Sequence, residues 1–303
     1  MKATRDGFGD QLVESDKDNL DVIGLSADLG KATKINKFGA AYPDRIYEMG
    51  IAENNMVGVA SGMSEYGYKV FLASFASFLT GKYDTIRCSI AYSKTPCIIV
   101  GTHCGMAIGR DGVTQMGLED LSLMRSLPGM VVLNPSTYNQ ARSIVKYLCD
   151  NKLETPHYLR LGRQPVEEHY SFPGTFEPGL GIVVKEGNSG VVFSTGCVLS
   201  DVLAATVGLD IAVVDMPTIK PLDRDIIMKY SNRNIFTVED HSIVGGLGSS
   251  VAEVIADTGM NGKLTRIGVN DIFPESGVPS DLYHKYGLSA SKIRQRILDE
   301  LGQ

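Results

Sequence analysis

One acidic side chain stands alone at the start of a small and apolar stretch of the sequence. The stretch "MGIAENNMVGVASGM" covers residues 49–63, and its only carboxylate belongs to Glu53. The apolar residues that follow recur at helical spacing, which places Glu53 in the first turn of a helix over residues 53–67. Glu53 can simply stabilise the helix dipole there, which contributes about 0.3–1 kcal/mol. The alternative is a chemical role for a carboxylate at the mouth of a buried helix.

A glycine-rich segment carries a second group of polar side chains. The sequence "GTHCGMAIGRDGVTQMGLED" covers residues 101–120 and contains His103, Asp111 and Gln115. It is too polar for a core and too rich in glycine for a helix. A long loop of this kind after a buried strand is typical of a functional site.

Two further features are each open to two interpretations. The aromatic residues Phe71, Phe75 and Phe78 have a spacing that is typical of core packing, but they can also enclose a flat ligand. Arg163 ends a strand in "LGRQP" and can form either a surface ion pair or a fork for a phosphate group.

Short apolar strands alternate with helical patterns through most of the chain. Strands are predicted at 21–28, 45–50, 69–75, 96–103, 130–136, 156–165, 189–196, 210–217, 234–240 and 263–269. Helices are predicted at 53–67, 77–94, 118–127, 138–151, 199–207, 223–231, 246–258 and 288–301. The alternation predicts an α/β fold with two consecutive domains and mostly parallel sheets.

A proline- and glycine-rich stretch divides this pattern. We expect a first domain over 1–165, a linker over 166–181 and a second domain over 182–303. In parallel sheets the functional groups lie beyond the carboxyl ends of the strands. The loops 26–45, 102–117 and 160–164 therefore should hold the site.

Composition excludes several classes of function. The 303 residues carry a formal charge of −6, which argues against a nucleic-acid surface. No apolar run approaches the roughly 20 residues of a membrane span, and the first residues lack a secretory signal. The five cysteines have no metal or disulfide spacing, so free thiols in a cytoplasmic protein are expected.

Other binding motifs are weak. The five histidines are scattered, and no metal site is predicted. Gly245, Gly246 and Gly248 precede a helix, but their spacing is GGxG rather than GxGxxG. We interpret them as a tight turn with close helix packing rather than a dinucleotide site.

Taken together, these separated motifs resemble one family. The segment from "MGIAENNMVGVASGM" to "MVVLNPS" is similar to the pyrimidine-binding domain of transketolase. The segments "VFSTG", "VVDMPTIKPLD" and "EDHSIVGGLGSSVAEVI" resemble its C-terminal domain. The resemblance covers nearly the whole chain and implies ketol transfer with thiamine diphosphate.

The resemblance assigns roles on the cofactor side of the site. It implies that Glu53 hydrogen-bonds the aminopyrimidine ring of thiamine diphosphate and shares a proton with it. Phe75 and Phe78 would hold that ring, and Asp28 would lie near the thiazolium half. A third aromatic of some relatives is replaced here by Gly81.

The resemblance also assigns roles on the substrate side. His103 and Asp111 would contact the hydroxyls of the bound ketose, His103 at the reacting centre, and Gln115 would contact the sugar chain. Arg5, Ser26 and Arg163 would grip the phosphate of the acceptor sugar, since guanidinium forks suit a dianion.

The resemblance further implies a partner. Relatives carry an N-terminal domain that binds the diphosphate and Mg²⁺ through a GDG motif, which this chain does not contain. We therefore expect a separate N-terminal subunit, with Mg²⁺ bound mainly by that partner, in an α₂β₂ assembly. The alternatives are a 1-deoxyxylulose-5-phosphate synthase, the β subunit of a 2-oxoacid dehydrogenase, and a non-catalytic subunit.

Overall fold

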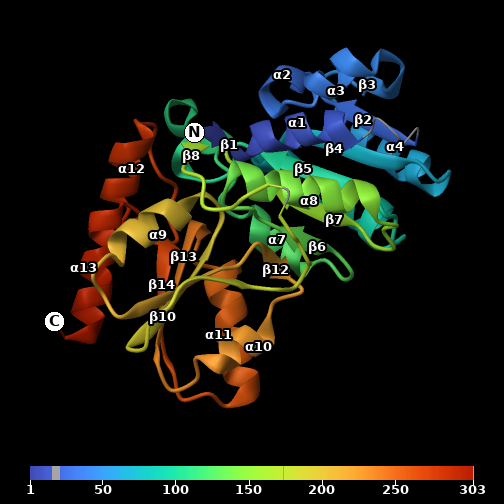
Figure 1. The fold of residues 1–303 in the computed structure, drawn as a ribbon. Helices are drawn as coiled ribbons and strands as arrows, with labels where there is room; N and C mark the ends of the chain where they lie inside the picture. Colours follow the sequence, from blue (N-terminus) through green and yellow to red (C-terminus); the bar gives the residue numbers. More distant parts are fainter. Residues whose placement is uncertain (16–20, 173, 303) are drawn as a thin grey trace.

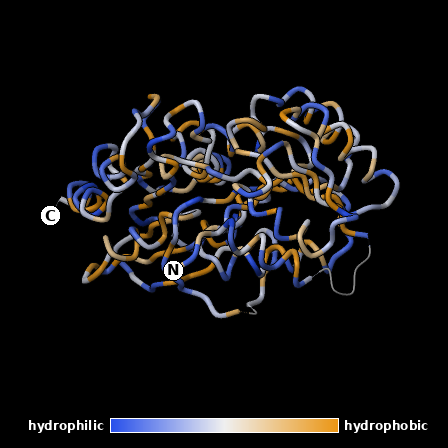
Figure 2. Tube along the Cα trace, turned by 90° about the horizontal axis from the view of Figure 1, so that it is seen from above, coloured by the Kyte–Doolittle hydropathy of each residue, from blue (hydrophilic) through white to orange (hydrophobic). Residues whose placement is uncertain are grey.

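A computed structural model describes residues 1–15, 21–172 and 174–302. It contains two mostly parallel sheets with helices packed against them, one in each half of the chain (Figure 1). Apolar stretches run through the interior, with hydrophilic stretches distributed around them (Figure 2). The predicted α/β fold with two mostly parallel sheets is confirmed.

The larger sheet has seven strands and carries the predicted site loops. In spatial order the strands are β12 (Thr218–Lys220), β6 (Val131–Leu133), β7 (His157–Arg160), β5 (Ile98–Thr102), β4 (Lys69–Phe75), β2 (Val22–Ser26) and β3 (Ile46–Glu48). All pairs are parallel except β12 with β6. Every residue of β2 and β5 is buried, because helices cover both faces of the sheet.

Eight α-helices belong to this half among the described residues. They are α1 (Thr4–Ser15), α2 (Gly30–Thr33), α3 (Asn36–Ala41), α4 (Glu53–Glu65), α5 (Ala76–Thr80), α6 (Tyr83–Ile86), α7 (Asp120–Ser126) and α8 (Tyr138–Asp150). Helices α1 and α8 bury apolar residues in one cluster on one face, and α4, α5, α6 and α7 do so in another.

Three features of this half differ from the sequence-based expectation. Helix α1 was not predicted, because Gly7 and Gly9 lower its helix propensity. At Gly7 a Cβ atom would lie 2.5 Å from the carbonyl oxygen of Tyr138, so glycine permits the close contact with α8. The helix predicted at 77–94 breaks after Thr80, and the loop predicted at 26–45 contains α2 and α3.

The second sheet has five strands. In spatial order they are β14 (Lys263–Val269), β13 (Asn234–Ser242), β10 (Gly190–Thr195), β11 (Ile211–Asp215) and β9 (Ile182–Lys185), with only β9 antiparallel to its neighbour. Its helices are α9 (Leu199–Ala205), α10 (Arg224–Lys229), α11 (Leu247–Thr258), α12 (Pro279–Lys285) and α13 (Ala290–Leu301). Strand β9 and helix α12 were not predicted.

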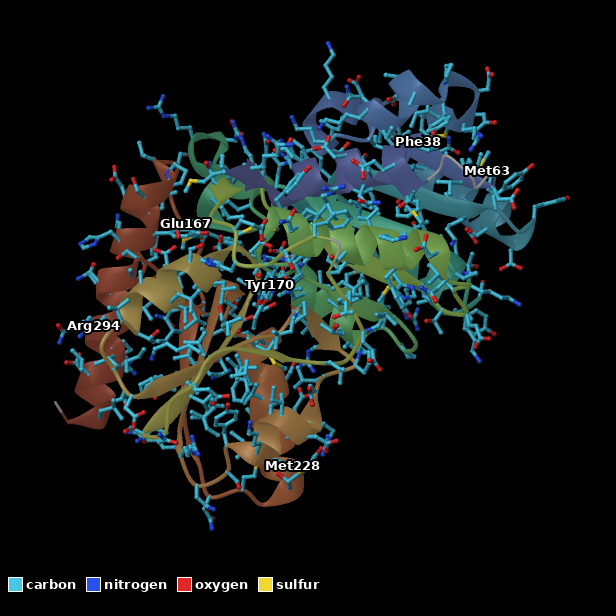
Figure 3. All side chains as sticks on the ribbon, in the orientation of Figure 1. Phe38, Met63, Glu167, Tyr170, Met228 and Arg294 are labelled. Carbon is cyan, nitrogen blue, oxygen red and sulfur yellow. The ribbon has the colours of Figure 1, made fainter. Side chains whose placement is uncertain are left out.

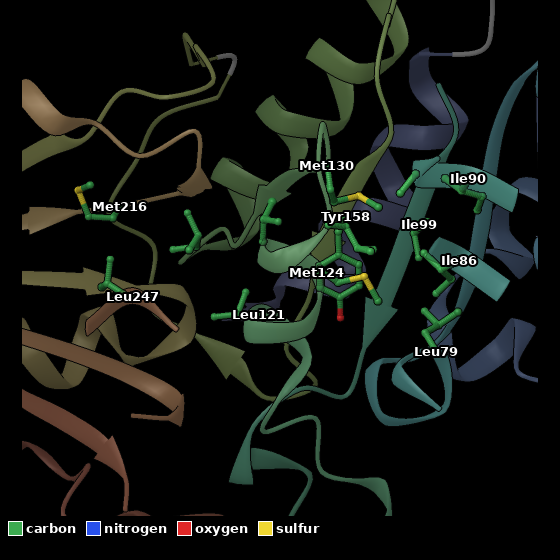
Figure 4. Packing of buried hydrophobic residues seen from close by; sticks show 14 of the residues in the cluster. Leu79, Ile86, Ile90, Ile99, Leu121, Met124, Met130, Tyr158, Met216 and Leu247 are labelled. Atoms are coloured by element: carbon green, nitrogen blue, oxygen red, sulfur yellow. The ribbon is translucent and has the colours of Figure 1, made fainter. Parts of the chain in front are cut away.

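The two halves contribute residues to the same sheet and to the same hydrophobic cluster. Strand β12 follows the second sheet's β11 in the chain but pairs with β6 of the first sheet. One hydrophobic cluster includes Leu121 and Met124 of α7 together with Met216 and Leu247 from the second half (Figure 4). The first half therefore shares a strand pair and a buried apolar cluster with the second.

The segment predicted as a linker lies between the two halves, and Tyr170 marks it in Figure 3. The Tyr170 hydroxyl donates a 2.8 Å hydrogen bond to Asp215 Oδ2 at the end of β11. A two-stranded antiparallel pair, β1 (Lys2–Ala3) with β8 (Pro165–Val166), ties the start of the chain to the start of this segment. None of the described helices has the length and apolar character needed to cross a bilayer.

Candidate functional site

The predicted site residues gather at one edge of the larger sheet. Strands β2, β4 and β5 are parallel neighbours, so their carboxyl ends meet there. Ser26 ends β2, Phe75 ends β4, and His103 follows β5 directly. Helix α4 also begins at this edge, which brings Glu53 beside β4.

Glu53 points into the protein rather than into solvent. Its residue is 7% exposed, and Ser74 Oγ in β4 donates to its Oε1 at 3.3 Å. Ala52 occupies the N-cap position of α4 and makes no side-chain cap hydrogen bond. The carboxylate thus gains from the positive end of the helix while facing the sheet edge, where it can reach a ligand.

Two aromatic rings and an imidazole form a stack at the same edge. The ring centroids of Phe75 and Phe78 are 5.2 Å apart, and those of Phe75 and His103 are 3.9 Å apart. Phe71, the third member of the predicted set, is fully buried in the core on the α1 side of the sheet. Gly81 is exposed, and a Cβ atom there would meet no atom closer than 3.4 Å, so the protein offers room for a larger side chain at this position.

His103 is held as a neutral ring. Arg5 Nη1 lies 2.9 Å from its Nε2, and Thr102 Oγ1 lies 2.9 Å from its Nδ1. A guanidinium can only donate, so Nε2 accepts and Nδ1 carries the proton. Burial, together with the positive charges of Arg5, Arg163 and Lys34, lowers the pKa of His103 to about 3. His103 is therefore a hydrogen-bond acceptor at neutral pH and not a proton donor through Nε2.

The phosphate-binding candidates include unsatisfied donors. Arg5 Nη1 donates to the carbonyl oxygen of Ala32 at 2.8 Å, but its buried Nε has no hydrogen-bond partner in the described structure. The buried Oγ of Ser26 has none either. Buried polar atoms are normally paired, so these donors fit a site for an anionic ligand.

Arg163 and Asp111 are paired with each other. Arg163 Nη1 lies 2.7 Å from Asp111 Oδ2, with side-chain exposures of 39% and 44%, and it also donates to the carbonyl oxygen of Ile108 at 3.2 Å. Gln115 is partly buried in the next turn of the same loop. A half-exposed pair of this kind is weak and can open for a ligand.

Asp28 lies at the rim of the site. Its φ of 56° is in the left-handed region, and its backbone N–H donates to Glu48 Oε1 at 2.6 Å. Among the described contacts, its carboxylate makes no hydrogen bond to the other candidates. Direct contacts link Phe78, Phe75, His103 and Arg5, and Arg163 pairs with Asp111. Glu53, Ser26, Asp28 and Gln115 lie on elements of the same sheet edge, without a direct contact to those residues among the described contacts.

Three residues of the site had no signal in the sequence. Ser74 donates to Glu53, and Thr102 accepts from the Nδ1–H of His103 in the tautomer that the Arg5 contact sets. Lys34 adds positive charge near His103 and has a φ of 75°. Only Thr102 could have been suspected, because it immediately precedes His103 in a strand that ends at the predicted loop.

The glycine-rich turn before α11 binds a carboxylate of the chain itself. Glu239 accepts hydrogen bonds of 2.8 Å from the backbone N–H groups of Leu247 and Gly248. A Cβ atom at Gly246 would lie 2.0 Å from Glu239 Oε2. The glycines thus serve a tight turn and close packing, as predicted, and Glu239 occupies the place where a phosphate would bind. Among the described residues, no group of three or more His, Cys, Asp or Glu side chains is placed to hold a metal ion.

Family models match both halves of the chain. Residues 1–168 match the transketolase pyrimidine-binding domain, and residues 179–293 match the transketolase C-terminal domain.

Curated relatives include both short and long proteins. A putative transketolase C-terminal section from Methanocaldococcus jannaschii is 39% identical, over 99% of this chain and 96% of the relative. A 6-deoxy-6-sulfo-D-fructose transketolase subunit from a Clostridium species is 32% identical, over 95% of this chain and 91% of the relative. A 1-deoxy-D-xylulose-5-phosphate synthase from Caldanaerobacter subterraneus is 31% identical over 97% of this chain, which spans 48% of that enzyme.

A solved structure agrees with these matches. It is described as a split-gene transketolase in an inactive β4 tetramer, and it shares 39% identity and a TM-score of 0.90, covering 99% of this chain and 98% of that chain. Two matching domains, similar relatives of nearly equal length and this shared fold lead to one conclusion: the chain belongs to the transketolase family.

Proposed function

We propose that this chain is the C-terminal subunit of a two-chain transketolase. It would transfer a two-carbon ketol unit from a ketose phosphate to an aldose phosphate with thiamine diphosphate as cofactor. The observation that carries the proposal is the buried Glu53 carboxylate, which lies at the sheet edge where the aromatic stack and the unsatisfied donors also lie.

The cofactor side of the site fits an aminopyrimidine. When bound, thiamine diphosphate supplies the carbanion chemistry that cleaves and forms the carbon–carbon bond. Glu53 would hold a proton between its carboxylate and the pyrimidine ring, with Ser74 fixing the carboxylate. Phe75 and Phe78 would pack against the ring, which contributes about 0.5–1.5 kcal/mol beyond burial. Asp28 would lie toward the thiazolium half.

The substrate side offers donors, acceptors and positive charge. The neutral His103 would accept a hydrogen bond from a sugar hydroxyl once Arg5 turns to the phosphate. Arg163 would join Arg5 and Ser26 at the phosphate, which frees Asp111 for another sugar hydroxyl, and Gln115 would contact the sugar chain. The opening of a surface ion pair costs only about 0–1 kcal/mol, so a dianion can displace it.

The proposed partner is an N-terminal subunit that binds the diphosphate and Mg²⁺. Support comes from relatives that match this chain along nearly their whole length and are described as a C-terminal section and as a transketolase subunit. The active assembly would be α₂β₂. The isolated chain should self-associate, as the related β4 tetramer does, but show no ketol transfer and only weak thiamine diphosphate binding.

Replacement of Glu53 tests the proposal. In the reconstituted pair, Glu53→Gln should lower kcat for xylulose 5-phosphate and ribose 5-phosphate by about 10²–10⁴-fold, because it removes the proton-holding group. Glu65→Gln, at the exposed end of the same helix, is the matched control and should leave kcat unchanged. Activity of Glu53→Gln within twofold of the unmodified pair would favour a non-catalytic subunit instead.

A second candidate function is 1-deoxyxylulose-5-phosphate synthesis, which the 31% identity to such a synthase favours. It differs in the donor, because that reaction consumes pyruvate. Pyruvate turnover without ketol transfer by the reconstituted pair would support this function. The β subunit of a 2-oxoacid dehydrogenase also uses an oxoacid, so the same assay separates both alternatives from ketol transfer but not from each other.

A further inference from the structure

A buried carboxylate near the end of a strand of the second sheet contacts the loop 104–118, which follows β5. Asp240, near the end of β13, is 5% exposed. Its Oδ1 accepts a 2.9 Å hydrogen bond from the backbone N–H of Met106, inside the loop that follows β5. Its Oδ2 accepts a 2.7 Å hydrogen bond from the Tyr283 hydroxyl of α12. The carboxylate therefore links the second half of the chain to a loop of the first half.

Hydrogen bonds beside this carboxylate join the two ends of the loop. The Gly105 N–H donates to the carbonyl oxygen of Gly117 at 2.8 Å. Arg160 Nη2 donates to that same oxygen at 3.0 Å and to the carbonyl oxygen of Asp240 at 2.9 Å. Gly105 has a φ of 73°, and a Cβ atom there would lie 2.0 Å from Asp240 Oδ2. Glycine is thus required for the carboxylate to reach the loop.

The outer part of the loop also rests on the second half. A Cβ atom at Gly109 would lie 3.0 Å from Pro279 at the start of α12, and one at Gly112 would lie 2.5 Å from Ser276 Oγ. On the opposite side, Gln164 Nε2 donates to the carbonyl oxygen of Ala107 at 2.8 Å. The loop is therefore clamped between the two halves, with Asp240 at its base.

We propose that Asp240 is a positioning residue for the sugar-binding loop 104–118. It fixes the loop base one turn from His103 and so sets the placement of the sugar-contacting side chains of His103, Asp111 and Gln115. The second half of the chain then takes part in substrate recognition. The identity of the sugar rests on the proposed function, whereas the positioning of the loop does not.

A neighbouring carboxylate supplies the matched control. Glu239 precedes Asp240 in β13 and is also buried, and it also accepts hydrogen bonds from backbone N–H groups, but those groups belong to α11 in its own half. If Asp240 has only a structural role, Glu239→Gln and Asp240→Asn should change hydrogen exchange in the loop 104–118 to the same extent. A positioning role predicts effects on the loop only for Asp240→Asn.

Amide hydrogen exchange of the full chain tests the positioning. Asp240→Asn should raise exchange about tenfold or more at 105–117, as expected for a lost hydrogen bond to a buried charge. Glu239→Gln should instead raise exchange at the start of α11. Tyr283→Phe keeps the aromatic ring and should act as Asp240→Asn does, with a smaller effect. Unchanged exchange at 105–117 in both loop variants overturns the proposal.

Kinetics of the reconstituted pair test the consequence for the substrate. Asp240→Asn should raise KM for the ketose about tenfold with thiamine diphosphate affinity unchanged, because Glu53 and Phe75 are on other elements. An equal loss of ketose and thiamine diphosphate affinity in Asp240→Asn contradicts the proposal. The same rise in KM for the ketose in Glu239→Gln also contradicts it. If the unmodified pair shows no ketol transfer, the proposed function fails while hydrogen exchange still decides the role of Asp240.

Discussion

At the scale of single residues, the site is defined by how its polar groups are paired. His103 receives a hydrogen bond from Arg5 and donates one to Thr102, and these two contacts leave one tautomer. Its φ of 58° is unusual for a residue with a side chain, and such backbone strain is concentrated at functional sites. The His103 ring is thus a neutral acceptor at Nε2 in the free chain, with Arg5 as its donor.

The charge state of His103 gives a testable pH dependence. Its pKa is lowered to about 3 from 6.5 by burial first and by the charge of Arg5 next. Arg5→Gln removes that charge and should move the pKa upward, though it should stay below 6.5 because the burial remains. Ring nitrogen shifts in NMR spectra across pH 3–7 measure this.

A second histidine is the internal control for that measurement. Burial lowers the pKa of His157 to about 4, and Arg5 is not among its causes. Its pKa should not move in Arg5→Gln. A His103 pKa that falls or stays fixed in the variant would contradict the assigned hydrogen-bond pattern.

The types of residue in the sequence indicated the candidate site, whereas the contacts between those residues could not be predicted from it. Glu53 and the loop residues His103, Asp111 and Gln115 stand out because polar side chains are rare beside buried strands. The pairing of Arg5 with His103 spans 98 positions of the chain, and nothing local encodes it.

At the scale of elements, continuous apolar runs made the parallel strands predictable. Strands β4, β5, β10 and β11 coincide closely with predicted segments, because strands buried on both faces need apolar residues throughout. The edge strand β14 also coincides with its predicted segment, although Lys263 and Arg266 in it are exposed. The break between α5 and α6 falls at Gly81, which is the C-cap residue of α5. Glycine is unfavourable inside a helix, so this local signal was available and was not used in the prediction. Strand β12 pairs with β6 from the other half of the chain, a long-range partner that its local sequence does not indicate.

Helix α8 offers a test of how local signals stabilise an element. Thr137 is its N-cap residue, and its Oγ1 accepts a 3.2 Å hydrogen bond from the backbone N–H of Gln140. Thr137→Ala should lower the free energy of unfolding by about 1 kcal/mol, because a buried donor loses its partner. Denaturant titration of the full chain measures this.

Helix α13 supplies the comparison for that substitution. Ser289 is also an N-cap residue, but its side chain makes no cap hydrogen bond. Ser289→Ala should change the free energy of unfolding by less than about 0.5 kcal/mol. Equal losses in the two variants would mean that the cap hydrogen bond of α8 contributes nothing specific.

At the scale of the whole molecule, two family domains behave structurally as one unit. Strand β12 extends the first sheet from the second half, and Lys220 Nζ in β12 donates to the carbonyl oxygen of Arg125 at 2.9 Å. The buried pair of Arg160 and Asp120, with atoms 2.8 Å apart, lies against the end of β13 through the Arg160 contact with Asp240. These contacts run through the same region that holds the substrate loop.

This shared interior predicts a single unfolding transition for the chain. Separate domains with a small polar interface unfold independently, whereas one cluster here joins Leu121 and Met124 to Met216 and Leu247 (Figure 4). Calorimetry should give one peak with a calorimetric enthalpy equal to the van't Hoff enthalpy per cooperative unit. Met124→Ala should cost about 2–5 kcal/mol and move that one peak to lower temperature without splitting it, because both halves lose the same contact. Two resolved peaks, of which only one moves in Met124→Ala, would show that the halves fold separately and that the loop clamp joins two independent bodies.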